Sequence, residues 1–217
     1  MSKFNLKSFV RQMYDKPHII KRLIWCFVAV TLMGICVSIL NLIALGTDPC
    51  SMMNFAISDA LGLSFGNWQA IMNTCLFVVV FVFGRENIGF GTLFNMFVVG
   101  YACDLTDFIR NKLWPDFEFT SLAIKITVML VTVFVFIIAA AVYMSVDLGT
   151  SPYDATSFII GKKLKRIPFG VTRILYDCAV TGIALLFHGK AGIVTVLMMF
   201  GIGPCVQFMQ KFIKRFF

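Results

Sequence analysis

Six long apolar runs alternate with more polar segments along the 217-residue chain. Each run reaches or approaches the roughly 20 residues that an α-helix needs to cross the hydrocarbon core of a bilayer. The pattern therefore predicts an all-α fold, a polytopic transmembrane helix bundle with six spans. The runs are 23–45, 68–83, 91–109, 122–146, 171–187 and 191–209.

A five-residue motif follows both the first and the fourth run. Leu45-Gly46-Thr47-Asp48-Pro49 recurs as Leu148-Gly149-Thr150-Ser151-Pro152, about half of the chain further on. Matches at a similar spacing pair Phe65-Gly66 with Phe169-Gly170, Thr92 with Thr195, and Gly100 with Gly203. We interpret the chain as two tandem repeats in one membrane domain, repeat 1 at 23–112 and repeat 2 at 121–210.

The segments after the motifs, 47–64 and 150–167, each predict a short helix. Pro49 and Pro152 suit the first helical turn, and the polar residues before them can cap it. Helices from these prolines to Leu61 and Leu164 would be about 20 Å long, short of the hydrocarbon thickness of about 30 Å. We therefore expect each repeat to hold three spans and one re-entrant helix, which must be buried in protein or line a wet cavity.

Three spans and one re-entrant helix make an odd number of crossings, so the second repeat would be inverted relative to the first. The basic run 162–166 would then lie inside the cell and the uncharged counterpart 61–64 outside. In the alternative, both short helices span and the repeats are parallel, which places Arg110 and Lys112 inside. Charge counting leaves both topologies open.

Composition supports a membrane location, since 59% of the residues are hydrophobic, 14% are charged and the mean hydropathy is +0.87. The net charge of +8 resides in the membrane flanks and does not indicate a nucleic-acid surface. Basic residues concentrate in the N-terminal segment 1–22 and the tail 211–217, so both termini are expected in the cytoplasm.

Polar residues inside the spans are the candidates for function, because ionisable groups are costly there. Arg173 and Asp177 stand one helical turn apart, and Gln69 and Asn73 occupy the matching positions of the first repeat. The alternative role for such residues is hydrogen bonding between helices. The candidate substrate or pathway residues are Thr47, Asp48, Pro49, Ser51, Asn54, Gln69, Asn73, Asn95, Asp104, Asp147, Thr150, Ser151, Pro152, Asp154, Arg173 and Asp177.

No pattern in the chain predicts a catalytic, metal or cofactor site. The seven cysteines are scattered through apolar segments without a C-x-x-C motif, and the two histidines have no ligand partners at metal spacing. A phosphate-binding glycine loop and a nucleophile elbow are absent from the sequence, so we expect no enzyme.

Several of these motifs together resemble the YczE/YyaS/YitT family of bacterial integral membrane proteins. The resemblance rests on the Leu-Gly-Thr-Asp-Pro turn, the following Phe-Gly, the Gly-Phe-Gly-Thr stretch 89–92 and the stretch Gly100-Tyr-Ala-Cys-Asp104, and it covers nearly the whole chain. It is to the YczE-like branch, which lacks the soluble C-terminal domain of YitT-like members. The second half departs at Ile193-Val194-Thr195 and at Gln207, which replaces the helix-end Asp. The resemblance implies a bacterial plasma membrane and supplies no substrate.

Two functions fit these observations. The first is a transporter or permease for an unknown small solute, with its site between the two short helices. The second is a non-transporting scaffold or regulator that assists a partner enzyme or export system. The expected partners are the lipid bilayer, the solute, and either further copies of the chain or another membrane protein.

Overall fold

We describe a computed structural model of the chain, which covers residues 16–115, 117–164 and 167–217. The described part is all-helical, as predicted. Its long helices are α2 (Ile19–Ile43), α4 (Phe65–Phe83), α5 (Phe90–Leu113), α6 (Leu122–Ser145), α8 (Phe169–Leu186) and α9 (Ile193–Ile213). The short ones are α3 (Pro49–Leu61) and α7 (Pro152–Lys163), with 3-10 turns η1 (Arg85–Asn87) and η2 (Lys214–Phe216).

Five of the described helices, α2, α4, α6, α8 and α9, are long and apolar enough to cross a membrane. The sequence predicted six spans. The remaining one is α5, which has 24 residues, as many as α6, but includes Asn95, Asp104 and Asp107. These polar residues make α5 less apolar than the other five long helices, although it is similar to them in length.

The two short helices begin as the sequence predicted. α3 has 13 residues and α7 has 12, and each has its proline in the first turn. Asp48 caps α3 by accepting a hydrogen bond from the Ser51 backbone N–H at 3.0 Å. The Ser151 hydroxyl oxygen caps α7 by accepting one from the Asp154 N–H, also at 3.0 Å. Both helices are therefore defined by side-chain caps at their N-termini.

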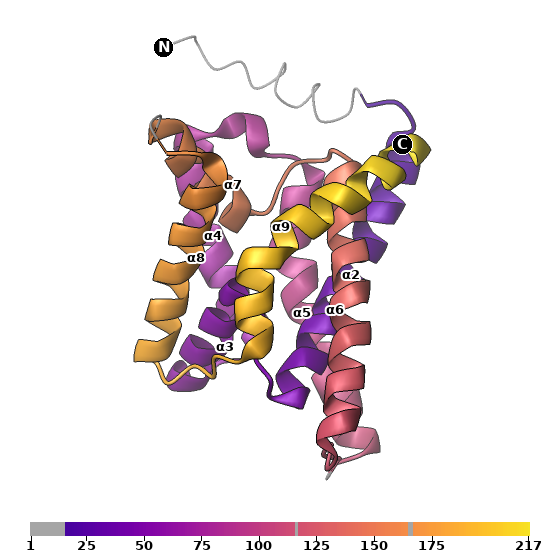
Figure 1. Cartoon of the computed structure of the whole chain (residues 1–217). Helices are drawn as coiled ribbons and strands as arrows, with labels where there is room; N and C mark the ends of the chain where they lie inside the picture. The colour runs from indigo at the N-terminus through magenta and orange to yellow at the C-terminus, as the bar shows by residue number, and fades with distance from the viewer. Residues whose placement is uncertain (1–15, 116, 165–166) are drawn as a thin grey trace.

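The long helices run in alternating directions (Figure 1). In this view α2, α5 and α8 descend, whereas α4, α6 and α9 ascend, and α3 and α7 lie at opposite ends of the bundle. α2 packs against both α5 and α6, and α6 packs against α9. Each short helix packs against a long helix from the other half of the chain, α3 against α8 and α7 against α4. The two halves are thus interleaved.

Backbone hydrogen bonds join each Leu-Gly-Thr turn to a helix start in the other half. The Leu45 carbonyl accepts from the Val194 N–H at 3.1 Å, and the Leu148 carbonyl accepts from the Gly91 N–H at 2.7 Å. Gly46 has a φ of +97° and Gly149 a φ of +98°, conformations that strongly favour glycine. The two turns therefore have the same backbone shape and the same kind of partner.

The helix starts that receive these turns are capped in the same way. The Thr92 hydroxyl accepts from the Gly89 N–H at 3.1 Å, and the Thr195 hydroxyl accepts from the Gly192 N–H at 3.3 Å. From the sequence, the second copy of this stretch, Ile193-Val194-Thr195, departs from the first. Gly192 nevertheless stands where Gly89 does, so the cap is preserved although the residues between the glycine and the threonine differ.

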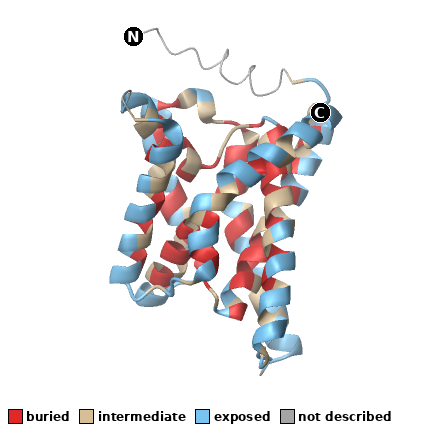
Figure 2. Ribbon diagram, in the orientation of Figure 1, coloured by how far each residue is buried: buried red, intermediate tan, exposed pale blue. Residues whose placement is uncertain are grey.

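Burial follows the arrangement of the helices (Figure 2). Buried residues face the interior of the bundle, and the outward faces of the long helices are exposed. The core includes Val30, Val37 and Leu40 of α2, each at most 1% exposed. Large apolar side chains such as Phe134 and Leu186 point outward, at 60% and 80% exposure. An apolar outer surface of this extent suits contact with lipid.

Candidate functional site

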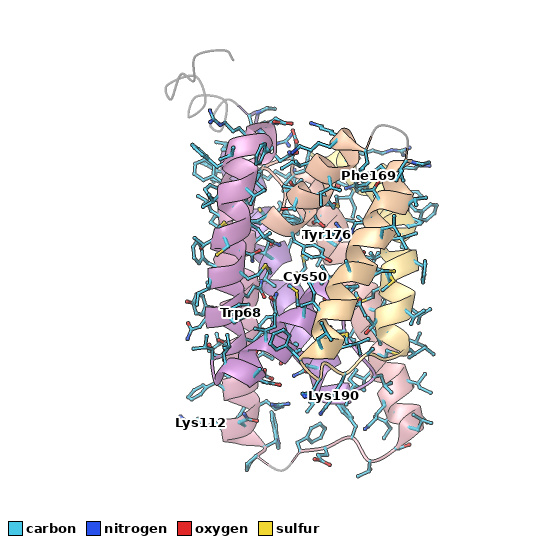
Figure 3. All side chains as sticks on the ribbon, turned by 90° about the vertical axis from the view of Figure 1, so that its left-hand side faces the viewer. Cys50, Trp68, Lys112, Phe169, Tyr176 and Lys190 are labelled. Carbon is cyan, nitrogen blue, oxygen red and sulfur yellow. The ribbon has the colours of Figure 1, made fainter. Side chains whose placement is uncertain are left out.

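The candidate site lies where α3 and α7 begin, inside the bundle. Figure 3 labels Cys50, in the first turn of α3, and Tyr176 of α8, both within the middle part of the bundle. Asp48 caps the α3 end and Ser151 caps the α7 end. The free N–H groups and the dipole at a helix N-terminus give each end a partial positive charge.

Arg173 is the centre of a polar network between α7 and α8. It forms an ion pair with Asp154 of α7, and its Nε lies 3.2 Å from an Asp177 oxygen on its own helix. Its Nη1 also lies 3.3 Å from the Ser157 hydroxyl. The pairing of Arg173 with Asp177 one turn away confirms the spacing argument from the sequence. The contact with Asp154 could not be inferred from local spacing.

Tyr153 completes this network, although it was not among the candidate residues predicted from the sequence. Its hydroxyl donates a hydrogen bond to Asp177 at 2.7 Å. The Arg173 guanidinium lies 5.0 Å from the centroid of the Tyr153 ring, within cation–π range. The Asp177 side chain is 3% exposed, whereas those of Arg173 and Asp154 are each 27% exposed. Asp177 is therefore the buried part of the network, whereas Arg173 and Asp154 are partly accessible.

Asp154 serves the helix as well as the ion pair. One of its oxygens accepts a hydrogen bond from the Ser151 hydroxyl at 2.8 Å, next to the cap that Ser151 provides. A carboxylate in the first turn of α7 is also favoured by the helix dipole. Capping and ion pairing are thus combined in one side chain.

The start of α3 contributes polar atoms without partners. One oxygen of Asp48 accepts from Ser51, and the other, Oδ1, is buried without a hydrogen bond. Asn54 is 1% exposed, its Nδ2 lies 3.7 Å from the Cys50 sulfur, and its Oδ1 has no partner. Cys50 of α3 and Tyr176 of α8 pack against a buried cluster that includes Tyr153 of α7. The polar groups of α3, α7 and α8 therefore form one neighbourhood.

The other candidate residues have varied surroundings. Gln69, Asn73 and Asn95 are buried, at 6%, 3% and 8% exposure. Asp104 accepts a hydrogen bond from the Gly66 N–H at 3.0 Å, which ties α5 to the start of α4. The remaining buried ones are Thr47, Ser51, Pro49 and Pro152, all at the turns that begin the short helices.

Asp147 does not join the central network. Its side chain is 72% exposed and pairs with Lys16 at the end of the bundle where α2 begins. Asp147 has a φ of +51°, so it forms part of the turn that precedes α7. Proximity to the motif in sequence suggested a role in the site, but the turn directs the side chain to the surface.

A cavity of about 230 Å³ opens at the same end of the molecule. Its lining includes Glu86, Asn87, Asp147, Thr150 and Gln210, and the Thr150 hydroxyl oxygen is buried without a partner. Glu86 pairs with Lys162 of α7 at 2.6 Å, and this hydrogen bond to the ammonium lowers the pKa of the carboxyl. The cavity therefore reaches the residue that precedes the α7 cap.

Within the described residues, no group of three or more His, Cys, Asp or Glu side chains is arranged to hold a metal ion. The Arg173 network offers charged groups together with hydrogen-bond donors and acceptors. Its geometry is suited to binding.

The long apolar helices and their exposed apolar side chains define a polytopic helical membrane protein. The chain belongs to a family described as "Family of unknown function (DUF6198)", which matches residues 20–211.

Three relatives are similar to most or about half of the chain. An uncharacterized protein of Haemophilus influenzae is 26% identical over 86% of this chain and 82% of its own length. The uncharacterized protein YyaS of Bacillus subtilis is 23% identical over 80% of this chain and 84% of its own. The uncharacterized membrane protein YczE of Bacillus subtilis is 26% identical over 55% and 53%. No solved structure matches the chain. The resemblance to YyaS-like and YczE-like proteins is therefore confirmed.

Proposed function

We propose that this membrane protein is a transporter that carries a small solute across the bilayer, without covalent chemistry. The observation that supports this most directly is the convergence of two capped helix N-termini on the Arg173 network inside the bundle. Discontinuous helices whose ends meet within the membrane form the substrate sites of many secondary transporters.

The proposed architecture is a pair of inverted repeats related by a pseudo-two-fold axis in the membrane plane. It is supported by the opposite directions of the neighbouring helices α2 and α6 and by the placement of α3 and α7 at opposite ends. The reciprocal bonds from Leu45 to Val194 and from Leu148 to Gly91 add to this support. Parallel repeats would place equivalent helices in the same direction.

The proposed orientation puts the start of α2 and the ends of α7 and α9 in the cytoplasm. The basic residues at these ends are Lys16, Lys21, Arg22, Lys162, Lys163, Lys211, Lys214 and Arg215. Glu86 and Asp147 are the acidic residues near them in the described part of the chain. This excess of positive charge favours the cytoplasmic side. Of the predicted N-terminal segment, 1–15 lies outside the described residues.

Cysteine accessibility tests the topology. In a functional background without native cysteines, Ser64→Cys and Lys163→Cys are labelled separately in sealed cells with a membrane-impermeant maleimide. Inverted repeats predict labelling of the first from outside and of the second from inside only. Labelling of both from inside only would establish parallel repeats and remove the shared site.

Metabolite profiling tests the transport itself. Cells expressing the wild-type chain are compared with cells expressing Arg173→Gln or Asp177→Asn at equal membrane levels, with exposed Lys190→Gln as the control. We expect at least one solute to change its distribution between cell and medium in the wild type and control only. An unchanged profile in all strains would refute a transport role.

An alternative function is a scaffold that binds another membrane protein. It is favoured by Gly182 of α8 and Gly201 of α9, whose added Cβ atoms would meet nothing within 4 Å. Small residues on lipid-facing helices allow close helix association. A phenotype that depends on a partner and survives changes at Pro49, Pro152, Arg173 and Asp177 would favour this function.

A further inference from the structure

We infer that the site where α3 and α7 converge binds a small monovalent cation, held by oxygen atoms of Asp48 and Asn54. The inference rests on the proposed function and specifies the class of solute or coupling ion. It is carried by two observations, the charges of the network and the buried oxygen atoms without donors.

Carboxyl groups outnumber basic groups in this neighbourhood. Asp154 and Asp177 both pair with Arg173, and Asp48, which caps α3, is a third carboxyl group, one of whose oxygens has no partner. With all four groups ionised, one positive charge faces three negative charges. A bound cation reduces this imbalance in a region of low dielectric constant, where uncompensated charge is costly.

Arg173 already has partners within the protein. Its Nη1 already contacts Asp154 and Ser157, and its Nε donates to Asp177. An incoming carboxylate or phosphate would lie beside the carboxyl groups of Asp154 and Asp177 that pair with this guanidinium. The guanidinium is therefore a counter-charge within the protein, which limits the excess of negative charge without removing it.

The second observation concerns atoms on α3. Oδ1 of Asp48 and Oδ1 of Asn54 are buried and lack a hydrogen-bond donor. Nearly all buried polar atoms find a partner, so such orphans point to a missing one. Asn54 is 1% exposed, and its Nδ2 lies 3.7 Å from the sulfur of Cys50 in the first turn of α3. Carboxylate and amide oxygens are the ligands that hard cations prefer, and they also accept from an ammonium group.

Cation binding can be measured as a rise in the thermal unfolding midpoint of the purified protein. Sodium, potassium and choline chloride are each titrated at constant ionic strength against N-methyl-D-glucamine chloride. The first two arms report a metal ion and the third an organic ammonium. We expect a saturable rise with at least one of them, since a ligand that binds only the folded state raises its stability.

Asp48→Asn is the informative variant, because asparagine caps a helix as well as aspartate does and so preserves α3. It should weaken the apparent affinity for the cation at least tenfold. Asn54→Leu should weaken it as well, whereas Glu86→Gln, at the exposed pair with Lys162, should leave it unchanged.

Two results would overturn the inference. One is the absence of a saturable shift with all three cations. The other is stabilisation by sodium sulfate beyond sodium chloride at equal sodium that is lost in Arg173→Gln, which would identify an anion site. A solute flux that persists without cation binding would refute the cation and keep the transporter. Cation binding without any solute flux would support the cation site and refute the transporter.

A separate observation concerns the two ends of the bundle. α4 and α5 touch through glycines, since a Cβ on Gly66, in the first turn of α4, would lie 2.9 Å from the Gly100 carbonyl carbon in the middle of α5. The Gly66 N–H also donates to Asp104. The counterparts Gly170 of α8 and Gly203 of α9 have no atom within 4 Å of an added Cβ. The matching helix pair is therefore apart at the other end.

The geometry points to a second state in which α8 and α9 close through Gly170 and Gly203. Gln207, which stands where Asp104 does, is exposed, and its amide oxygen can accept from the Gly170 N–H in the first turn of α8. In that state α4 and α5 would separate, so that the two ends close in turn. This inference depends on the proposed inverted repeats.

Disulfide trapping tests the closure. In a cysteine-free background, the pair Gly170→Cys and Gly203→Cys should form a cross-link under mild oxidation. The control pair, Gly170→Cys with Gly201→Cys, places the second thiol on another face of α9 and should not. Equal cross-linking of both pairs, or none of the test pair, would contradict the closed state. If the test pair forms a cross-link but the cysteines at positions 64 and 163 are both labelled only from inside, the closure would be supported and the inverted repeats refuted.

Discussion

The contact between α4 and α5 gives the sharpest prediction, because a matched position exists in the other half. We consider Gly66→Ala and Gly170→Ala. An added Cβ on Gly66 would lie 2.7 Å from an Asp104 oxygen, 2.9 Å from the Gly100 carbonyl carbon and 3.0 Å from its oxygen. The Asp104 side chain can move, but the backbone of α5 cannot do so without shifting the helix.

The expected cost follows from this geometry. Overpacking of a closely packed contact typically costs about 1–3 kcal/mol. For a chain of this size that corresponds to a fall in the unfolding midpoint of about 2–12 °C. Gly170→Ala meets no atom within 4 Å and replaces glycine near the start of a helix. Its midpoint should stay the same or rise slightly, because alanine is the better helix former.

Both variants are purified in the same detergent, and their unfolding is followed by intrinsic fluorescence and by circular dichroism. The reasoning is refuted if Gly66→Ala unfolds at the wild-type temperature, or if Gly170→Ala is destabilised as much. A midpoint for Gly170→Ala near the wild type combined with loss of transport would agree with a closed state of α8 and α9.

Three further predictions use the same stability measurement. Gly149→Ala should lower the unfolding midpoint through a cost of about 1–3 kcal/mol, because its φ is +98° and a Cβ would lie 2.5 Å from the Gly89 nitrogen; an unchanged midpoint would contradict the turn geometry. Tyr153→Phe removes the donor to the buried Asp177 and should cost about 1.5–3 kcal/mol; a stabilised variant would argue against this hydrogen bond. Glu86→Gln should shift the midpoint only slightly at neutral pH, because the ion pair is exposed. The pKa of the Glu86 carboxyl is lowered in the folded protein, so the small stabilisation from the ion pair is present above the unfolded-state pKa. It disappears as the pH falls through the folded-state pKa. A larger difference in midpoint between wild type and variant in acid would contradict this sign.

Local features of the sequence were sufficient for most elements. Apolar runs located the long helices, and a proline after a polar cap located the start of α3 and α7. The spacing of Arg173 and Asp177 predicted their contact, because residues four apart on one helix are neighbours whatever surrounds them. These predictions depend only on the backbone of one element.

Contacts between elements were not accessible in the same way. The pairing of Asp154 with Arg173 and the hydrogen bond from Tyr153 depend on how α7 packs against α8. The sequence does not distinguish a polar residue near the motif that faces the interior, such as Asp154, from one that faces the surface, such as Asp147. The positive φ of Asp147 decides between these outcomes, and no single residue type signals it.

The bond between the Leu45 carbonyl and the Val194 N–H has a consequence for synthesis. Residue 45 enters the membrane early, yet its partner lies close to the end of the chain. Until residue 194 has emerged from the ribosome, the Leu45 carbonyl lacks the hydrogen-bond donor that it has in the folded protein. Chains truncated before α9 should therefore insert their first helices but leave α3 without a fixed position. The last stage of assembly would then be the docking of the earliest turn onto the last helix.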